Sequence, residues 1–384
     1  MGMTFVNSRS LVPIVCSMLL TLSLCAAEEP HSTAAASAPA SRTQLGVGDG
    51  SKADRDLLLA GRVGFGRNAD GGNAGETCRV TTDADSGAGS LREALSRPEP
   101  LWIIFDGDYT IHLSSGLPVS SRKTIDGRGR HVTLTGHGVA GLILDGVEHV
   151  VIENLELRDF GDTERTKFND PYDAISITNR AHDIWIDHCS LSMAGDKLIG
   201  IGGGATDITV SWCRFTDQQQ VFQIGNMTTQ EADVDTRVTS HHNFFDGTGY
   251  RHPVLSYGRA HAFNNYLRRW RTYGMRSERT GQLCSEANIF EAGDNKTATR
   301  FNTGGNGWND SHTRFDDRPG ALSSTGDWKI NGAKIRTNDP DSVFNPAEAY
   351  PYQAAPADEA LRTLVEQGAG WQPTLDNSPE GSHR

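Results

Sequence analysis

The stretches Ile186-Asp-His-Cys-Ser-Leu191 and Val210-Ser-Trp-Cys-Arg-Phe215 share one pattern and lie 24 residues apart. Both alternate apolar and polar residues, which is typical of short β-strands whose side chains point to opposite faces. The pattern occurs six times along the chain, at intervals of 22 to 34 residues. Its apolar marks are Leu157, Leu191, Phe215, Phe244, Tyr266 and Ile289.

Repeats of roughly 20 to 50 residues indicate a solenoid. One coil cannot bury its inner face alone, whereas stacked coils build a continuous apolar core with ladders of like residues. We therefore predict an all-β fold, a single-stranded right-handed parallel β-helix. Cys189 and Cys213 occupy equivalent places in two repeats, so we expect them on neighbouring coils about 4.8 Å apart, with a disulfide left open.

The two ends of the chain differ in composition from its middle. Residues 1–27 are predicted to be a signal peptide, because 11–24 are mainly apolar and a small-residue cleavage site follows. An uncleaved anchor and a lipoprotein at Cys25 are the alternatives. Residues 28–56, rich in Ala, Ser, Pro and Thr, are predicted to be a disordered linker. Residues 57–384 are then one β-helix domain with an irregular C-terminal segment.

Charge and export signal together limit the partners. The formal net charge is −12, so the protein as a whole should not attract a polyanion, and we expect no nucleic acid partner. An acidic substrate would have to meet a local basic patch. We expect a secreted protein, extracellular or periplasmic, that is monomeric and has no membrane span in its mature chain.

Such a basic patch is present in the sequence. Seven arginines lie from Arg251 to Arg279, and Glu278 is the only acid among them. The planar guanidinium group recognises carboxylates through paired hydrogen bonds. The cluster therefore predicts a groove for an acidic polymer, although a solvated basic face remains the alternative, since strand residues alternate in direction.

Acids and histidines near the repeats are a weaker signal. Asp173, Asp187 and Asp196 lie close to strand-like segments, and two carboxylates on neighbouring coils could hold calcium. Their spacing alone fits turn caps better. The histidines near strand positions are interpreted as members of polar ladders rather than as acid/base or metal sites. They are His182, His188, His241, His242 and His261.

Several further segments make the chain similar to a known family. It resembles the pectate lyase superfamily, polysaccharide lyase family 1, over about residues 60–300. The resemblance implies a parallel β-helix that cleaves pectate or pectin by β-elimination, giving 4,5-unsaturated products. The segments that carry it include Gly89-Ser-Leu-Arg92, Lys123-Thr-Ile-Asp-Gly-Arg-Gly129, Trp185-Ile-Asp-His188, His241-His-Asn-Phe-Phe245, Arg251-His-Pro253 and Ser285-Glu-Ala-Asn-Ile-Phe290.

The resemblance assigns roles to individual residues. It places the catalytic base at Arg251, where a guanidinium that is normally always protonated would have to lose its proton. The family's second arginine falls on Ser256, its lysine on Gln220 and a further substrate-binding arginine on Arg276. Cationic charge beside the uronate carboxyl group acidifies C5–H, and Lys197 is a further candidate for it. We expect these last four residues to contact substrate.

The resemblance also implies calcium. The family's calcium carboxylates fall on Pro171, Asp173, Asp196 and Gly200, so two of the four remain. We expect Asp173 and Asp196 to form a depleted, weak calcium site that substrate carboxylates complete. Pectin lyases work without calcium but carry an arginine where this chain has Asp196. Because several family groups are missing, a non-catalytic carbohydrate-binding or cell-surface β-helix is the alternative function.

Overall fold

The computed structural model describes residues 48–161, 171–225, 230–301 and 319–373. The predicted signal peptide (1–27) and most of the predicted linker lie outside these ranges. Helix α1 (Lys52–Ala60) begins inside the predicted linker, so regular structure starts earlier than the predicted boundary at residue 57. Ser51 caps α1 by accepting the N–H of Asp54, which stabilises its first turn. No helix of the described part is long and apolar enough to cross a membrane.

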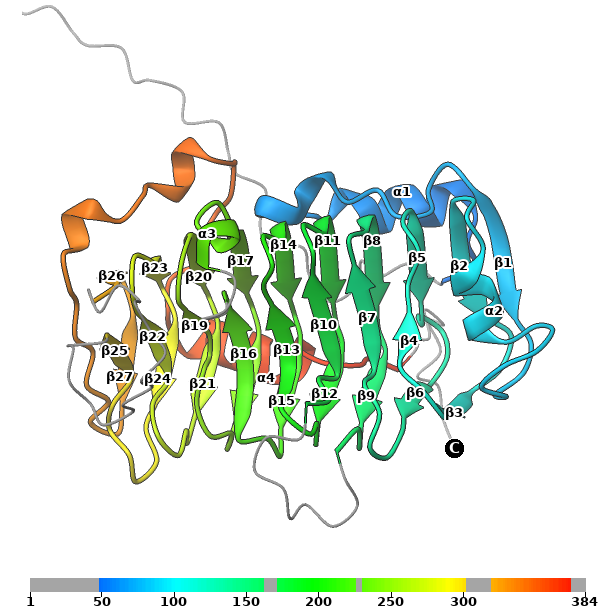
Figure 1. Cartoon of the computed structure of the whole chain (residues 1–384). Coiled ribbons are helices and arrows are strands. Elements are labelled where there is room, and N and C mark those ends of the chain that lie inside the picture. Colours follow the sequence, from blue (N-terminus) through cyan, green and yellow to red (C-terminus); the bar gives the residue numbers. More distant parts are fainter. Residues whose placement is uncertain (1–47, 162–170, 226–229, 302–318, 374–384) are drawn as a thin grey trace, which may run out of the picture. The chain divides into compact units, whose positions relative to one another are not determined.

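The strands form three sheets in which every neighbouring pair is parallel, so the chain winds as a parallel β-helix (Figure 1). Sheet 1 contains β1 (Glu76–Val80), β2 (Leu101–Phe105), β5 (Lys123–Asp126), β8 (Glu148–Glu153), β11 (His182–Asp187), β14 (Thr206–Ser211), β17 (Arg237–His241), β20 (Arg259–Phe263), β23 (Gln282–Glu286) and β26 (Ala321–Thr325). Sheet 2 contains β4 (Leu117–Pro118), β7 (Leu142–Asp145), β10 (Ile175–Thr178), β13 (Lys197–Ile201), β16 (Gln220–Ile224), β19 (Val254–Leu255), β22 (Met275–Ser277) and β25 (Thr299–Phe301). Sheet 3 contains β3 (Tyr109–His112), β6 (Val132–Thr135), β9 (Glu156–Arg158), β12 (Ser190–Ser192), β15 (Arg214–Thr216), β18 (Phe244–Asp246), β21 (Tyr266–Arg268), β24 (Ile289–Glu291) and β27 (Trp328–Ile330).

Helices are short and lie outside the coils. The remaining ones are η2 (Phe65–Asn68), α2 (Leu91–Ser96), α3 (Gln230–Asp233), η3 (Pro340–Ser342), η4 (Pro346–Glu348) and α4 (Glu359–Gly368). α4 covers the outer face of sheet 3, where Leu361 and Val365 pack on Phe244. The chain after η4 therefore runs back along the β-helix instead of adding another coil.

The pairing of neighbouring strands confirms the predicted repeat, except that one predicted position is off by one residue. Ile186 lies opposite Val210, and Leu191 lies opposite Phe215, as the aligned patterns predict. Phe215, however, lies opposite Phe245 rather than the predicted Phe244. Both phenylalanines are buried, since Phe245 enters the core and Phe244 lies under α4.

Ladders of like side chains connect the coils. Asn243 donates to Asn265 over 3.0 Å, and Asn265 donates to Asn288 over 2.9 Å. All three asparagines are fully buried, so these bonds satisfy amides that would otherwise be costly to bury. Cys189 and Cys213 lie on neighbouring coils, as predicted, because the residues that follow them, Ser190 and Arg214, lie opposite each other in sheet 3. Both are buried and free, so no disulfide joins them.

Candidate active site at the edge of sheet 2

Most of the residues predicted for chemistry lie at or just before the N-terminal ends of successive strands in sheet 2, whereas Ser256 follows β19 and Arg276 lies within β22. Lys197 opens β13, Gln220 opens β16 directly opposite it, and Tyr250 lies opposite Gln220 in a parallel bridge. Asp173 lies just before β10, one coil earlier. Neighbouring strands are about 4.8 Å apart, so the backbones at Lys197 and Arg251 are separated by two strand spacings, or about 10 Å.

Arg251 is held by a neutral partner. Its guanidinium group donates through Nη1 to the side-chain oxygen of Gln223 on β16. It also lies 5.4 Å from the ring centre of Tyr250, within the range of a cation–π contact. Within the described ranges, no carboxylate forms an ion pair with Arg251. Its other N–H groups are therefore available to a ligand.

Lys197 bridges the two predicted metal ligands. Its Nζ lies 3.1 Å from Oδ1 of Asp173 and also bonds Oδ2 of Asp196. Its backbone N–H donates to the same Asp173 oxygen over 3.0 Å. Burial raises the pKa of Asp173 to about 6, although Lys197 opposes this. The side chains of Lys197, Asp173 and Asp196 are 11 to 25% exposed, so these three charged groups are largely covered by protein but still reach solvent.

Comparison with known proteins decides the family. The model of the family described as pectate lyase matches residues 113–372, which include every residue of this site. The chain belongs to the pectate lyase family. Pectate lyase 1 of Ambrosia artemisiifolia is 34% identical over 336 residues, which is 82% of this chain and 81% of that protein. A pectate lyase of Nicotiana tabacum is 36% identical over 258 residues, or 63% of this chain and 64% of that protein. The chain spans less than two thirds of the length of several relatives that it matches, including the one from Nicotiana tabacum.

Solved structures share the fold. The crystal structure of Jun a 1, the major allergen from cedar pollen, has a TM-score of 0.70 at 29% identity. It covers 83% of this chain and 95% of that one. A pectate lyase from Bacillus sp. in complex with trigalacturonate has a TM-score of 0.57 at 20% identity, covering 81% and 98%. The β-helix is therefore the fold of this pectate lyase family member.

The residues present do not fit a calcium ion at the predicted place. Calcium takes six to eight oxygen ligands, whereas here the Lys197 amine already lies against both remaining acids. A Cβ atom at Gly200 would lie 2.3 Å from Oδ2 of Asp173 and 2.9 Å from Cε of Lys197. The lysine chain thus fills the space where the family pattern has a carboxylate. We therefore assign calcium no step in the chemistry of this site.

Arg276 and Ser256 are turned to the same acid. Arg276 forms an ion pair with Glu278 at 2.5 Å, and Arg279 forms another at 2.7 Å. Ser256 is 3% exposed and donates to Glu278 over 2.9 Å. Its hydroxyl group is therefore not available for the predicted direct contact with substrate. The side chain of Arg276 is 23% exposed and can reach a ligand only while sharing its charge with Glu278.

Gln223 is the site residue that sequence reasoning missed. It lies opposite Gly200 of β13 on one side and opposite Val254 of β19 on the other. It is therefore one coil before Arg251 and two coils after Asp173. Its amide N–H group donates to the carbonyl of Gly225 over 3.0 Å, which directs its oxygen toward Arg251. The sequence shows Gln223 close to Gln220 but not which residues lie opposite it on the neighbouring coils.

A second acidic group lies in sheet 1, away from Arg251. Ligand atoms of Glu153, Asp187 and His188 lie within 4.8 Å of one another, a set that was not predicted. Burial raises the pKa of Glu153 well above its usual range, with Asp187 adding to the shift. His188 bonds Asp187 at 2.6 Å and stacks on Trp212 of the next coil. Nδ1 of His188 is thus engaged by Asp187, whereas the two carboxylate oxygens of Glu153 have no hydrogen-bond partner within the described ranges.

Proposed function

We propose that this protein is a polysaccharide lyase that cleaves a pectate-type uronic acid polymer by β-elimination, with Arg251 as the base. The observation that carries the proposal is the placement of Arg251, which pairs with no carboxylate within the described ranges and whose backbone lies two strand spacings from that of Lys197. The family relationship supports the reaction class. The N-terminal segment 1–27 supports action outside the cytoplasm, and a monomer remains the expected state.

The reaction needs a base on one side of the sugar and positive charge at its carboxylate. Arg251 in its neutral form takes the C5 proton, and the C–H electron pair forms the C4=C5 double bond. The C4–O4 bond breaks, and O4 leaves with its electron pair and takes a proton from water. Positive charge at the uronate carboxylate stabilises the enolate-like transition state more than the ground state, which lowers the barrier.

Lys197 supports a reaction that is independent of metal. Its amine is a positive charge near the protein surface, held by Asp173 and Asp196. Arg276 adds a second charge on a later coil. We therefore propose that Lys197 takes the part that the family resemblance gives to calcium, and that Gln220, in register beside it, contacts the polymer.

Absorbance of unsaturated products tests the proposal directly. The full chain is incubated with polygalacturonate, methyl-esterified pectin and a neutral galactan, each with and without chelator. We expect unsaturated products from polygalacturonate, undiminished by chelator and absent with the Arg251→Ala protein. Binding of polygalacturonate without any product would instead support the non-catalytic carbohydrate-binding protein.

A further inference from the structure

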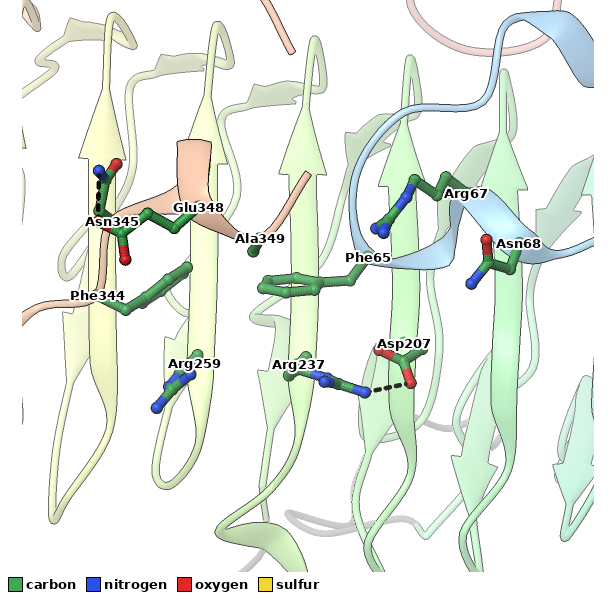
Figure 2. A pocket seen from close by; sticks show the side chains of 10 residues that line it. All are labelled: Phe65, Arg67, Asn68, Asp207, Arg237, Arg259, Phe344, Asn345, Glu348 and Ala349. Carbon is green, nitrogen blue, oxygen red and sulfur yellow. Dashed lines mark hydrogen bonds and ion pairs between the residues drawn. The ribbon is translucent and has the colours of Figure 1, made fainter. Parts of the chain in front are cut away.

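A cavity of about 510 Å³ lies on the outer face of sheet 1, on a different sheet from Arg251 (Figure 2). It is walled by η2 on one side and by the segment leading into η4 on the other. We infer that this cavity is a second binding site, for a carboxylated sugar unit of an acidic polysaccharide. The choice of polymer rests on the proposed function, but the geometry of the cavity does not.

The floor of the cavity places two arginines side by side. Arg237 opens β17 and Arg259 opens β20, and the two are paired in register. Arg237 forms an ion pair with Asp207 at 2.7 Å, whereas no carboxylate pairs with Arg259 in the part of the chain described here. Like charges directly opposite each other destabilise a sheet. A bound carboxylate would relieve this repulsion and accept hydrogen bonds from both guanidinium groups.

The walls add flat apolar surfaces above these charges. Phe65 and Phe344 lie with ring centres 6.0 Å apart, and their planes are tilted by 40°. Arg237 lies 5.9 Å from the Phe65 ring and Arg259 lies 5.8 Å from the Phe344 ring (Figure 2). Asn345 and Glu348 also line the cavity, and the Asn345 amide donates to Glu348 over 3.3 Å. A sugar presents an apolar ring face together with hydroxyl and carboxylate groups, and this cavity offers partners for each of them.

The cavity is rigid before any ligand arrives. The N–H of Phe65 donates to Oγ1 of Thr239 over 3.0 Å, and the same oxygen lies 2.9 Å from the hydroxyl of Tyr350. Gly66 approaches sheet 1 so closely that a Cβ there would lie 2.3 Å from the carbonyl oxygen of Ile184. Both walls are thus held against strands of sheet 1. Little ordering is required on binding, which favours affinity for a small unit.

Calorimetric titration with trigalacturonate tests the inference. The Arg251→Ala protein serves as the background, so that the ligand is not consumed. Changing Arg237→Gln and Arg259→Gln together should weaken one binding event by at least about 10-fold, because each hydrogen bond between charged groups contributes substantially to affinity. The matched control is Arg122→Gln with Arg130→Gln, which removes the same charge from exposed arginines elsewhere. This control should bind as the background does, and both proteins should keep the circular dichroism spectrum of the background.

Three results would overturn the inference. They are equal trigalacturonate binding by the test and control proteins, equally tight binding of the neutral galactose trimer, and equally tight binding of inorganic phosphate. Failure of the proposed function is visible separately in the absorbance assay on the unmodified protein. A protein that cleaves polygalacturonate but shows equal binding loses only this inference. A protein that binds trigalacturonate through Arg237 and Arg259 without forming product loses only the proposed reaction.

Discussion

Replacing Lys197 with alanine should convert the protein from metal-independent to calcium-responsive. The amine lies 3.1 Å from Asp173, so their attraction is about 5 kcal/mol at an effective dielectric constant of about 20. Desolvation offsets part of this, and breaking such a pair is expected to cost about 3 kcal/mol of stability. If this amine takes the proposed part at the substrate carboxylate, its loss should also lower turnover by about 10²–10³-fold.

The assay measures unsaturated product from polygalacturonate for the wild-type and Lys197→Ala proteins across a calcium series. The variant leaves two acids free, and about 10⁻⁴–10⁻³ M calcium should restore part of its activity, as at weak extracellular sites. The wild-type protein should be indifferent to calcium and to chelator. Lys329→Ala, at an exposed lysine on β27, is the control and should behave as wild type. Wild-type activity that disappears with chelator would refute the reasoning.

Three further changes probe separate parts of the site. Arg251→Ala should lower turnover by at least about 10²–10⁴-fold with the circular dichroism spectrum unchanged, and Arg251→Lys should fail nearly as badly because an ammonium group lacks the planar fork; wild-type turnover in either would disprove the assignment. Arg276→Ala should raise KM more than it lowers kcat on polygalacturonate, since it would hold a carboxylate in ground and transition state alike. Asp173, with its pKa raised to about 6, contributes stability that is present below its ordinary pKa and is lost as pH rises through 6. The difference in unfolding free energy between wild type and Asp173→Asn should therefore fall by about 3 kcal/mol from about pH 4 to 6, and a constant difference would contradict the shift.

The fold could be predicted because equivalent positions of successive strands carry similar apolar residues. Ile186 lies opposite Val210 on the next coil, and both are fully buried in the apolar core. The one-step error at Phe244 arose because α4 buries the outer face of sheet 3 there. An apolar residue was then favoured on both faces, and alternation no longer marked which side is the core.

The site was harder to predict because it depends on contacts between coils. Asp196 and Lys197 are adjacent in sequence, and adjacent strand residues normally point to opposite faces. Asp196 lies just before β13 rather than in it, so its carboxylate can turn back to the lysine amine. Nor could sequence show that Ser256 is buried against Glu278, or that Gln223 holds Arg251. Each of these facts requires knowing which residue lies one coil away.

The loss of two acids and the gain of a lysine amine fit together electrostatically. The family pattern implies four carboxylates with a divalent cation, a net charge of about −2, whereas Asp173, Asp196 and Lys197 give about −1 when ionised. Because Pro171 and Gly200 carry no acid, one ammonium group is enough to keep the net charge of the site no more negative than in the family pattern. Because that group is part of the chain, its presence does not depend on the calcium concentration. A site with only two carboxylates would be largely empty below about 10⁻⁴ M calcium, so under those conditions the lysine amine is the cation that this group retains.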